Sequence, residues 1–143
     1  MKKKLVAFTG SGISAESGIA TFRDTGGLWE NYKIEEVATP DAWKANPEKV
    51  QHFYNLRREN IRESVPNEAH LAIAMWESDH ELTVITQNID DLHERAGAGR
   101  LLHMHGEHLN AWCNACDARH PWRGTLLDRP ACPSCGVTGR LRP

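Results

Sequence analysis

The 143-residue sequence has no excess of positive charge, no long apolar run and no cysteine before residue 113. Its formal net charge of −2 gives no electrostatic case for binding nucleic acid or an anionic membrane. The first apolar run, from Leu5 to Phe8, is too short for a signal peptide, and no run approaches the length of a bilayer span. Internal repeats and low-complexity tracts are also missing. These absences favour a cytoplasmic protein that binds neither nucleic acid nor membrane.

The sequence does contain an alternation of strand-like and helix-like segments. Two short apolar runs, residues 4–9 and 81–86, are typical of buried parallel strands, and residues 100–104 are a third candidate. The other expected elements are helices that begin near Ile13, Asp41 (as a cap), Pro47 and Pro66, a short helix over residues 91–96, and a long loop over residues 19–40. Such an alternation predicts an α/β fold with a parallel sheet.

A glycine-rich string follows the first expected strand. Gly10-Ser-Gly12-Ile-Ser-Ala15 fits the pattern G-x-G-x-x-G/A, in which glycines let a phosphate approach the backbone and a helix N-terminus supplies N–H donors. A tight turn that needs small residues explains this string equally well. The acidic residue that ordinarily follows about 20 positions later, at the end of a second strand, is missing. An ordinary dehydrogenase is therefore not expected.

The four cysteines form two C-x-x-C pairs near the end of the chain. They are Cys113 with Cys116 and, after fifteen intervening residues, Cys132 with Cys135. Four thiolates at this spacing can complete the tetrahedral shell of a zinc ion and leave no position for water. We therefore expect residues 108–143 to form a small module around a structural zinc.

Two further groups of polar residues are candidates for a site. Gln87-Asn88-Ile89-Asp90 follows the second expected strand, where α/β folds place ligand-binding loops, although a turn capped by Asp90 or Asp91 is the alternative. His103 and His105 would share one face of a strand, and a histidine at a strand end suits general-base work. A surface histidine cluster is the plainer alternative.

Tyr54 and Arg57 lie three residues apart and would share one face of a helix. Together they could bind a carboxylate through a guanidinium fork and a phenol. A solvated, arginine-rich helix face is the alternative explanation.

Taken together, these motifs resemble those of the sirtuins, the NAD-dependent protein lysine deacylases. The strings that carry the resemblance are GSGISAESGIATFRDTGGLW, TQNIDDLHERAG, HMHGE and the two cysteine pairs, in that order. The sequence looks closest to the bacterial branch related to desuccinylases and demalonylases. In that branch a Tyr-x-x-Arg pair, here Tyr54 and Arg57, recognises an acidic acyl group, and Ala38-Thr39 before Pro40 is also similar to it.

The resemblance implies a role for each matching residue. NAD would be a co-substrate, with His105 as the general base, and zinc would be structural. The implied NAD-binding residues are Gly10, Ser11, Gly12, Ile13, Ala15, Glu16, Phe22, Arg23, Trp29, Gln87, Asn88, Ile89 and Asp90. In the implied reaction the carbonyl oxygen of an acyl-lysine protein substrate attacks C1′ of the nicotinamide ribose and expels nicotinamide. His105 then helps the 2′-hydroxyl attack the acyl group, and lysine and O-acyl-ADP-ribose are released.

The resemblance also implies a domain organisation. Residues 1–107 would be the NAD-binding, Rossmann-like part, with a cofactor loop at about 19–40 and a helical insert at about 41–78. Residues 108–143 would be the zinc module. Sirtuins continue beyond this point, so the chain is interpreted as an N-terminal portion that lacks the second Rossmann half, and we expect it to be poorly folded or inactive alone. A robust deacylation rate from the purified chain would contradict this.

A second functional hypothesis is a catalytically inactive, zinc-containing module that docks to another protein. The combination of His105 with Asn88 and Asp90 argues against it, because a docking module needs neither a base nor an amide reader. The expected lack of a C-terminal half argues for it. A nucleic-acid-binding zinc ribbon is disfavoured by the net charge of −2.

Overall fold

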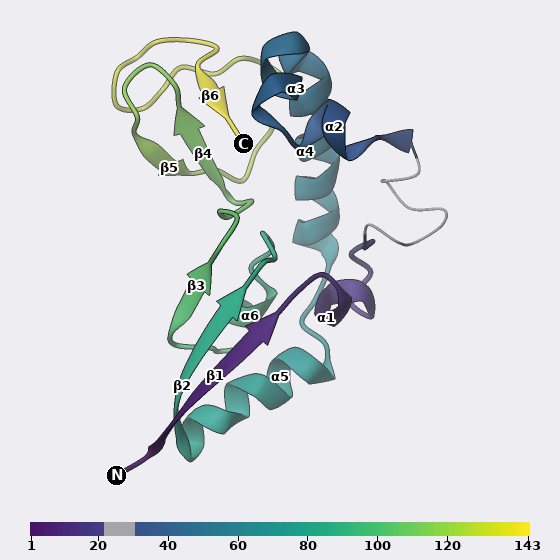
Figure 1. Ribbon diagram of the computed structural model, residues 1–143. Coiled ribbons are helices and arrows are strands. Elements are labelled where there is room, and N and C mark those ends of the chain that lie inside the picture. Colours follow the sequence, from purple (N-terminus) through teal and green to yellow (C-terminus); the bar gives the residue numbers. More distant parts are fainter. Residues whose placement is uncertain (22–30) are drawn as a thin grey trace. The chain divides into compact units, whose positions relative to one another are not determined.

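The computed structural model describes residues 1–21 and 31–143 (Figure 1). The chain divides into two compact units, one of Met1–Gly27 with Asn60–Glu107 and one of Leu28–Glu59 with His108–Pro143. This division groups Leu28–Glu59 with the cysteine-bearing segment, whereas the predicted domains run from 1 to 107 and from 108 to 143. The predicted boundaries stay a prediction.

The first unit is built on a parallel sheet of three strands. They are β1 (Lys3–Thr9), β2 (His80–Thr86) and β3 (Leu101–His103), in the order β1-β2-β3 (Figure 1). The register aligns Val84 of the central strand with Ala7 on one side and Leu101 on the other. The expected α/β fold with a parallel sheet is thus confirmed.

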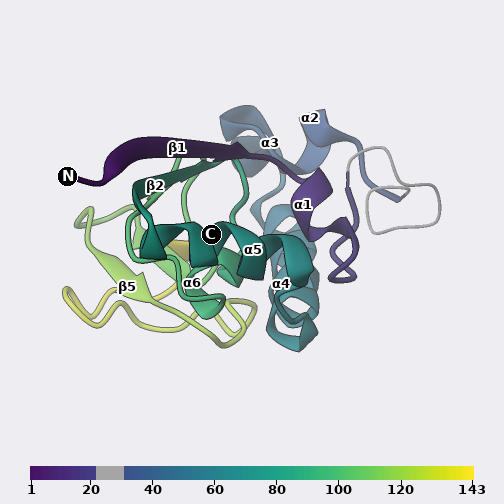
Figure 2. The same ribbon diagram turned by 90° about the horizontal axis from the view of Figure 1, so that it is seen from below.

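The two faces of this sheet differ in burial. On one face, Ala7, Leu82 and Val84 form a core against which Ile73 of helix α5 (Glu68–Met75) packs. Figure 2 shows α5 running alongside β1 and β2. Side chains alternate along each strand, so the other face carries Val6, Phe8 and Leu102, which remain exposed.

Short helices connect the strands of the first unit. α1 (Gly12–Ala15) follows β1, α5 is extended by the 3₁₀ turn η2 (Trp76–Ser78), and α6 (Leu92–Arg95) follows β2. Helix α5 begins one residue after Asn67, whose side chain accepts a hydrogen bond from the Ala69 N–H. The predicted start at Pro66 was therefore wrong, because the Asn67 cap determines where the helix begins.

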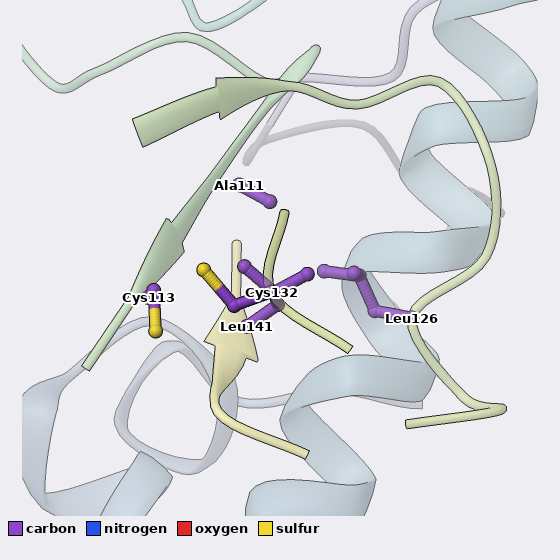
Figure 3. Close-up of a cluster of buried hydrophobic side chains, with 5 residues drawn as sticks. All are labelled: Ala111, Cys113, Leu126, Cys132 and Leu141. Atoms are coloured by element: carbon purple, nitrogen blue, oxygen red, sulfur yellow. The ribbon is translucent and has the colours of Figure 1, made fainter. Parts of the chain in front are cut away.

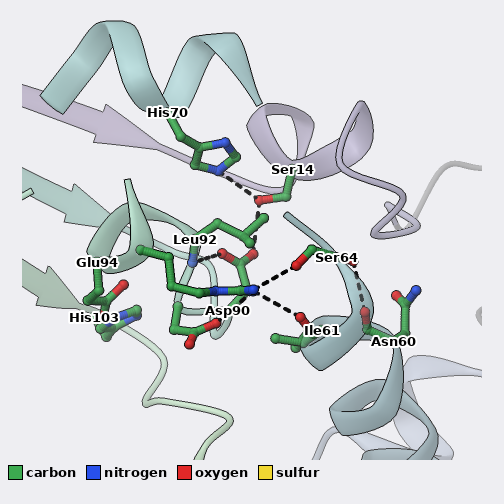
Figure 4. Close-up of polar contacts among 11 residues, drawn as sticks. Ser14, Asn60, Ile61, Ser64, His70, Asp90, Leu92, Glu94 and His103 are labelled. Atoms are coloured by element: carbon green, nitrogen blue, oxygen red, sulfur yellow. Dashed lines mark hydrogen bonds and ion pairs between the residues drawn. The ribbon is translucent and has the colours of Figure 1, made fainter. Parts of the chain in front are cut away.

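Arg95 of α6 ties this helix to the preceding segments of the unit. Its guanidinium donates to the carbonyl oxygens of Ser64 at 2.7 Å and Ile61 at 2.9 Å (Figure 4). Leu92, from the same helix, packs with Ile19 and Ile61 in a small buried cluster. These contacts hold the loop after β2 against the body of the unit.

The second unit begins with helices. α2 (Ile34–Val37) lies inside the predicted loop over residues 19–40, so that prediction was wrong for this part. α3 (Pro40–Ala45) is capped by Thr39, not by Asp41 as expected, because Thr39 is extended and its Oγ1 accepts the Ala42 N–H at 3.0 Å. α4 (Pro47–Glu63) starts at the predicted proline.

The cysteine-bearing segment forms a small antiparallel sheet. Its strands are β4 (Asn110–Cys113), β5 (Arg119–Pro121) and β6 (Leu141–Arg142), in the order β5-β4-β6. Five residues from its strands and loops, shown in Figure 3, form a buried cluster: Ala111, Cys113, Leu126, Cys132 and Leu141. Gln51 and Asn55 of α4 bind the backbone of this segment, through the Leu141 carbonyl and the Leu126 N–H. None of the described helices is both long and apolar enough to cross a membrane.

Candidate functional site

The three parallel strands end side by side. Thr9, Thr86 and His103 are aligned in the register, so the segments that follow them leave the same edge of the sheet. These segments contain the glycine string, the Gln87–Asp90 stretch and His105. Ligand sites of open α/β sheets lie at the carboxyl ends of strands. The fold therefore brings three of the predicted groups to one edge.

Gly10 and Gly12 have free space on their side-chain side. No described atom lies within 4 Å of a Cβ built on either residue, and neither has a positive φ. Packing and backbone conformation therefore do not require glycine at these positions. A ligand that approaches the backbone closely would require it.

Ser14 connects the glycine string to the loop after β2. Its hydroxyl donates to Asp90 Oδ2 at 2.9 Å and accepts from Asn88 Nδ2 at 3.0 Å (Figure 4 shows the Asp90 bond). Asn88 and Asp90 are both buried, and Asp90 Oδ1 accepts the Leu92 N–H at 3.2 Å. The amide and the carboxylate are therefore held in fixed orientations before any ligand binds.

One buried histidine bonds Ser14, and a second packs against the first. Nδ1 of His70 accepts the Asn67 backbone N–H, so the neutral ring carries its hydrogen on Nε2, which donates to Ser14 Oγ at 3.4 Å. The ring of His93 meets that of His70 edge to face at 4.9 Å and bonds Thr9 Oγ1 at 2.9 Å. Burial lowers the pKa of both histidines, which favours their neutral forms.

His103 lies at the end of β3 and forms an ion pair. Its Nδ1 donates to the Asn88 carbonyl at 2.8 Å, and its Nε2 lies 2.7 Å from Glu94 Oε1. Burial by itself lowers the pKa of His103. The bonds to Glu94 and Asn88 outweigh that effect, and the pKa lies above the ordinary histidine value. His103 therefore anchors the loop after β2, through its bonds to Asn88 and Glu94.

His105 is exposed two residues further on. Its Nδ1 lies 3.0 Å from the carbonyl oxygen of Gln87. A carbonyl can only accept, so Nδ1 carries the hydrogen and Nε2 is left with its lone pair. An exposed Nε2 lone pair at the edge of the sheet is what a general base requires.

The alternative to a ligand-binding role for the loop after β2 was a turn capped by Asp90 or Asp91. Asp91 is the N-cap of α6 but makes no side-chain capping bond, while Asp90 accepts the Leu92 N–H. Asp90 therefore fills part of the capping role as well as binding Ser14.

The remaining predicted residues lie near these groups. Four of them lie on or next to α1: Ser11, Ile13, Ala15 and Glu16. Ile89 packs against the cluster that contains Ile19. Phe22, Arg23 and Trp29 lie outside the described residues.

Tyr54 and Arg57 share one face of α4 in the second unit, as predicted. The Arg57 guanidinium carbon lies 6.0 Å from the centre of the Tyr54 ring. Burial raises the pKa of Tyr54, and the positive charge of Arg57 opposes this. His108 stacks on Tyr54 at 5.9 Å, and its burial, with Arg58 and Arg57 nearby, lowers its pKa to about 2. The phenol and the imidazole are thus both held neutral beside a guanidinium.

The four cysteine sulfurs converge, and their spacing fits a zinc ion. Cys113 and Cys135 have sulfurs 3.8 Å apart, as do Cys116 and Cys132, and all four lie within 4.8 Å of one another. Four sulfurs placed tetrahedrally at zinc–sulfur bonds of about 2.3 Å are separated by about 3.8 Å. These residues would therefore hold zinc as a closed, structural site.

The two C-x-x-C turns have the same backbone pattern. In each, the first cysteine accepts at its carbonyl from the N–H four residues later, which belongs to Asp117 or Gly136. Both of these residues have a positive φ, 58° for Asp117 and 71° for Gly136. The two turns therefore have the same backbone conformation at the residue that follows each C-x-x-C pair.

Comparison with known proteins agrees with this geometry. The sequence model of the Sir2 family matches residues 10–143. The chain belongs to the Sir2 family. Among its curated relatives, an NAD-dependent protein deacylase of Bdellovibrio bacteriovorus is 50% identical over 147 residues and is matched over 99% of this chain. Another of the same name, from Helicobacter pylori, is 59% identical over 108 residues, which is 76% of this chain.

Solved Sir2 structures resemble the whole described fold. A mutant Sir2 homologue in complex with ADP-ribose superposes with a TM-score of 0.87 at 44% identity, and a Sir2 homologue bound to NAD gives 0.86 at 43%. Each comparison covers 99% of this chain. The Sir2-family chain spans 62% and 46% of the two bacterial relatives and 57% and 56% of the two solved chains.

Several residues of the candidate site had no predicted role. Ser14, His70 and Glu94 were missed. The partners of Ser14 are distant in the sequence, 56, 74 and 76 positions away, and one of them is His70. Glu94 pairs with His103 nine positions away, across the turn that joins α6 to β3. The only available signal for Ser14 was its place inside the glycine string.

Proposed function

We propose that the protein is an NAD-dependent protein lysine deacylase whose reaction takes place at the carboxyl edge of the β1-β2-β3 sheet. The observation that carries the proposal is His105, an exposed residue whose Nδ1 donates to the Gln87 carbonyl, so that Nε2 keeps its lone pair. Two relatives named NAD-dependent protein deacylase and the Sir2 homologues solved with NAD and ADP-ribose support it.

The residues at this edge suit NAD. Gly10 and Gly12 leave room for phosphate groups against the backbone, beside Ser11, Ile13, Ala15 and Glu16. Asn88 and Asp90 are fixed by Ser14, so an amide and a carboxylate are oriented to hold the nicotinamide carboxamide. Gln87 would contact a ribose hydroxyl. The roles of Phe22, Arg23 and Trp29 stay a prediction.

His105 would act as the base of the reaction. NAD, when bound, supplies a ribose whose bond to nicotinamide can be broken. His105 Nε2 would accept the proton of a ribose hydroxyl, which makes that oxygen a better nucleophile toward the acyl group. The Gln87 carbonyl would stabilise the protonated ring, because it keeps accepting the Nδ1 hydrogen throughout.

The experiment uses protein made from the complete reading frame that contains these residues. It is incubated with NAD and an acetyl-lysine peptide, and the deacylated peptide and free nicotinamide are measured by mass spectrometry. We expect His105→Ala to lower the rate by about 100-fold or more. His52→Ala, at an exposed position on α4, is the control and should retain the wild-type rate. A wild-type rate in folded His105→Ala would overturn the proposal.

The acyl preference is a finer proposal. We infer that Tyr54 and Arg57 recognise the carboxylate of succinyl- or malonyl-lysine, because a guanidinium and a neutral phenol lie on one helix face. Arg57→Met should raise KM for succinyl peptide and leave KM for acetyl peptide unchanged. An equal effect on both peptides would contradict the carboxylate role. Acylated proteins are the proposed substrates, and the cytoplasmic location stays a prediction.

A further inference from the structure

A histidine outside the C-x-x-C pairs touches the cysteine cluster. His120 lies on β5, and its Nε2 is 3.4 Å from Cys132 Sγ. Cys132 is a buried member of the module's core, whereas Cys116 and Cys135 are exposed. The contact therefore involves one of the two sulfurs that the protein keeps from solvent.

Strand pairing fixes the direction of the His120 side chain. His120 is paired with Ala111 of β4, and Ala111 is part of the same buried cluster as Cys132. Its strand neighbours Arg119 and Pro121 are exposed, while His120 is half-buried. The alternation of the strand therefore points the imidazole toward the sulfurs and its neighbours toward solvent.

The chemistry of the cluster determines which atom donates. When four thiolates hold a divalent ion, no sulfur keeps a hydrogen, so a sulfur can only accept. Nε2 of His120 must then carry the hydrogen and donate it to Cys132. Four thiolates with one divalent ion carry a net negative charge, and N–H donors stabilise that charge.

This donor comes from outside the C-x-x-C turns. His120 precedes Cys132 by twelve positions and lies on β5. His120 thus links a strand of the small sheet to a metal ligand of the second knuckle.

We propose that His120 is a positioning residue of the zinc site, which donates its Nε2 hydrogen to the Cys132 thiolate. This bond strengthens the retention of the metal and makes that sulfur less reactive toward electrophiles. The proposal concerns the metal site alone and does not depend on the deacylase reaction.

Three variants test it at one fixed pH. His120→Phe keeps a flat ring without a donor, His120→Gln keeps an N–H donor, and Arg119→Gln changes an exposed neighbour on the same strand. Zinc affinity is measured by competition with a chromophoric chelator, and the sulfur-to-metal absorption band is recorded after cobalt substitution. We expect His120→Phe to bind zinc about 10- to 100-fold more weakly and to shift the band. His120→Gln should lie between His120→Phe and wild type, and Arg119→Gln should match wild type.

A second measurement needs no substitution and covers the case in which His120→Phe does not fold. Wild-type protein is loaded with an NMR-active cadmium isotope. The Nε2 hydrogen of His120 should show scalar coupling to the metal through the Cys132 sulfur. Wild-type zinc affinity in folded His120→Phe, or no such coupling, would overturn the proposal. A wild-type protein that binds no zinc, cobalt or cadmium would overturn the zinc site itself.

Discussion

At the scale of single residues, the Ser14 hydroxyl is the atom on which the candidate site depends most. It uses its one hydrogen for Asp90 and accepts from Asn88 and His70, so its bonding capacity is filled. All four of these side chains are buried. Removing the hydroxyl would therefore leave buried groups of the site unpaired.

Ser14→Ala should lower the free energy of unfolding by about 1–3 kcal/mol, the cost of leaving buried hydrogen-bonding groups unsatisfied. Urea denaturation followed by circular dichroism measures this. Ser11→Ala is the matched control, because Ser11 is exposed and makes no side-chain capping bond; its effect should stay within about 0.5 kcal/mol. Equal effects of the two substitutions would contradict the role of Ser14.

The ion pair between His103 and Glu94 makes a prediction about pH. The pKa of His103 is raised above 6.5, the ordinary value for histidine, so its pairing stabilises the fold fully below that value. The stabilisation is lost as the pH rises through the raised pKa. His70 and His93 have lowered pKa values and act in the opposite sense, but they are present in both proteins compared below.

Wild type and Glu94→Gln should therefore differ most in unfolding free energy at pH values below about 6.5 and converge as the pH rises through the folded-state pKa. Urea unfolding of both proteins across this range measures the difference. A difference that grows with rising pH would contradict the assignment of the pair.

At the scale of elements, the start of α3 shows how backbone conformation selects a cap. Thr39 has φ −129° and ψ 154°, which lets its side chain accept the Ala42 N–H, and Pro40 occupies the first turn. Asp41 follows inside the helix and forms an exposed ion pair with Lys44, whose Nζ lies 3.6 Å from Asp41 Oδ1. Thr39 therefore caps α3, two positions before Asp41, the cap predicted from the sequence.

Thr39→Ala should cost about 1 kcal/mol of stability, the typical value for loss of an N-cap. Asp41→Ala is the control and should cost less, since its ion pair is exposed and weak. Thermal and urea unfolding of both variants give the comparison. A larger loss of stability in Asp41→Ala than in Thr39→Ala would contradict the assignment of Thr39 as the cap.

At the scale of the whole molecule, the cysteine-bearing sheet has a small core. Two of the five buried residues in Figure 3, Cys113 and Cys132, belong to the four cysteines that would hold zinc. So few apolar contacts contribute little free energy, and small modules of this kind commonly depend on their metal. We expect the parallel sheet of the first unit to depend on it far less, because its core contains no cysteine.

Removal of the metal by a chelator should therefore unfold residues 108–143 selectively. Hydrogen exchange read by mass spectrometry should show loss of protection at the amides of Asp117 and Gly136, while β1 and β2 keep theirs. Added zinc should restore the protection. Unchanged exchange in the cysteine turns after complete metal removal would contradict the prediction.

The sequence by itself determined the three strands of the parallel sheet, the cysteine turns and the residues at the strand ends, because apolar periodicity and ligand spacing are local signals. Only the tertiary structure decided which hydrogen-bond partners within the protein those residues have. The tautomer of His105 depends on the Gln87 carbonyl, the orientation of Asn88 depends on Ser14, and the donor to Cys132 comes from His120. Each is a contact between segments far apart in the chain, and such contacts exist only after the backbone has brought the segments together.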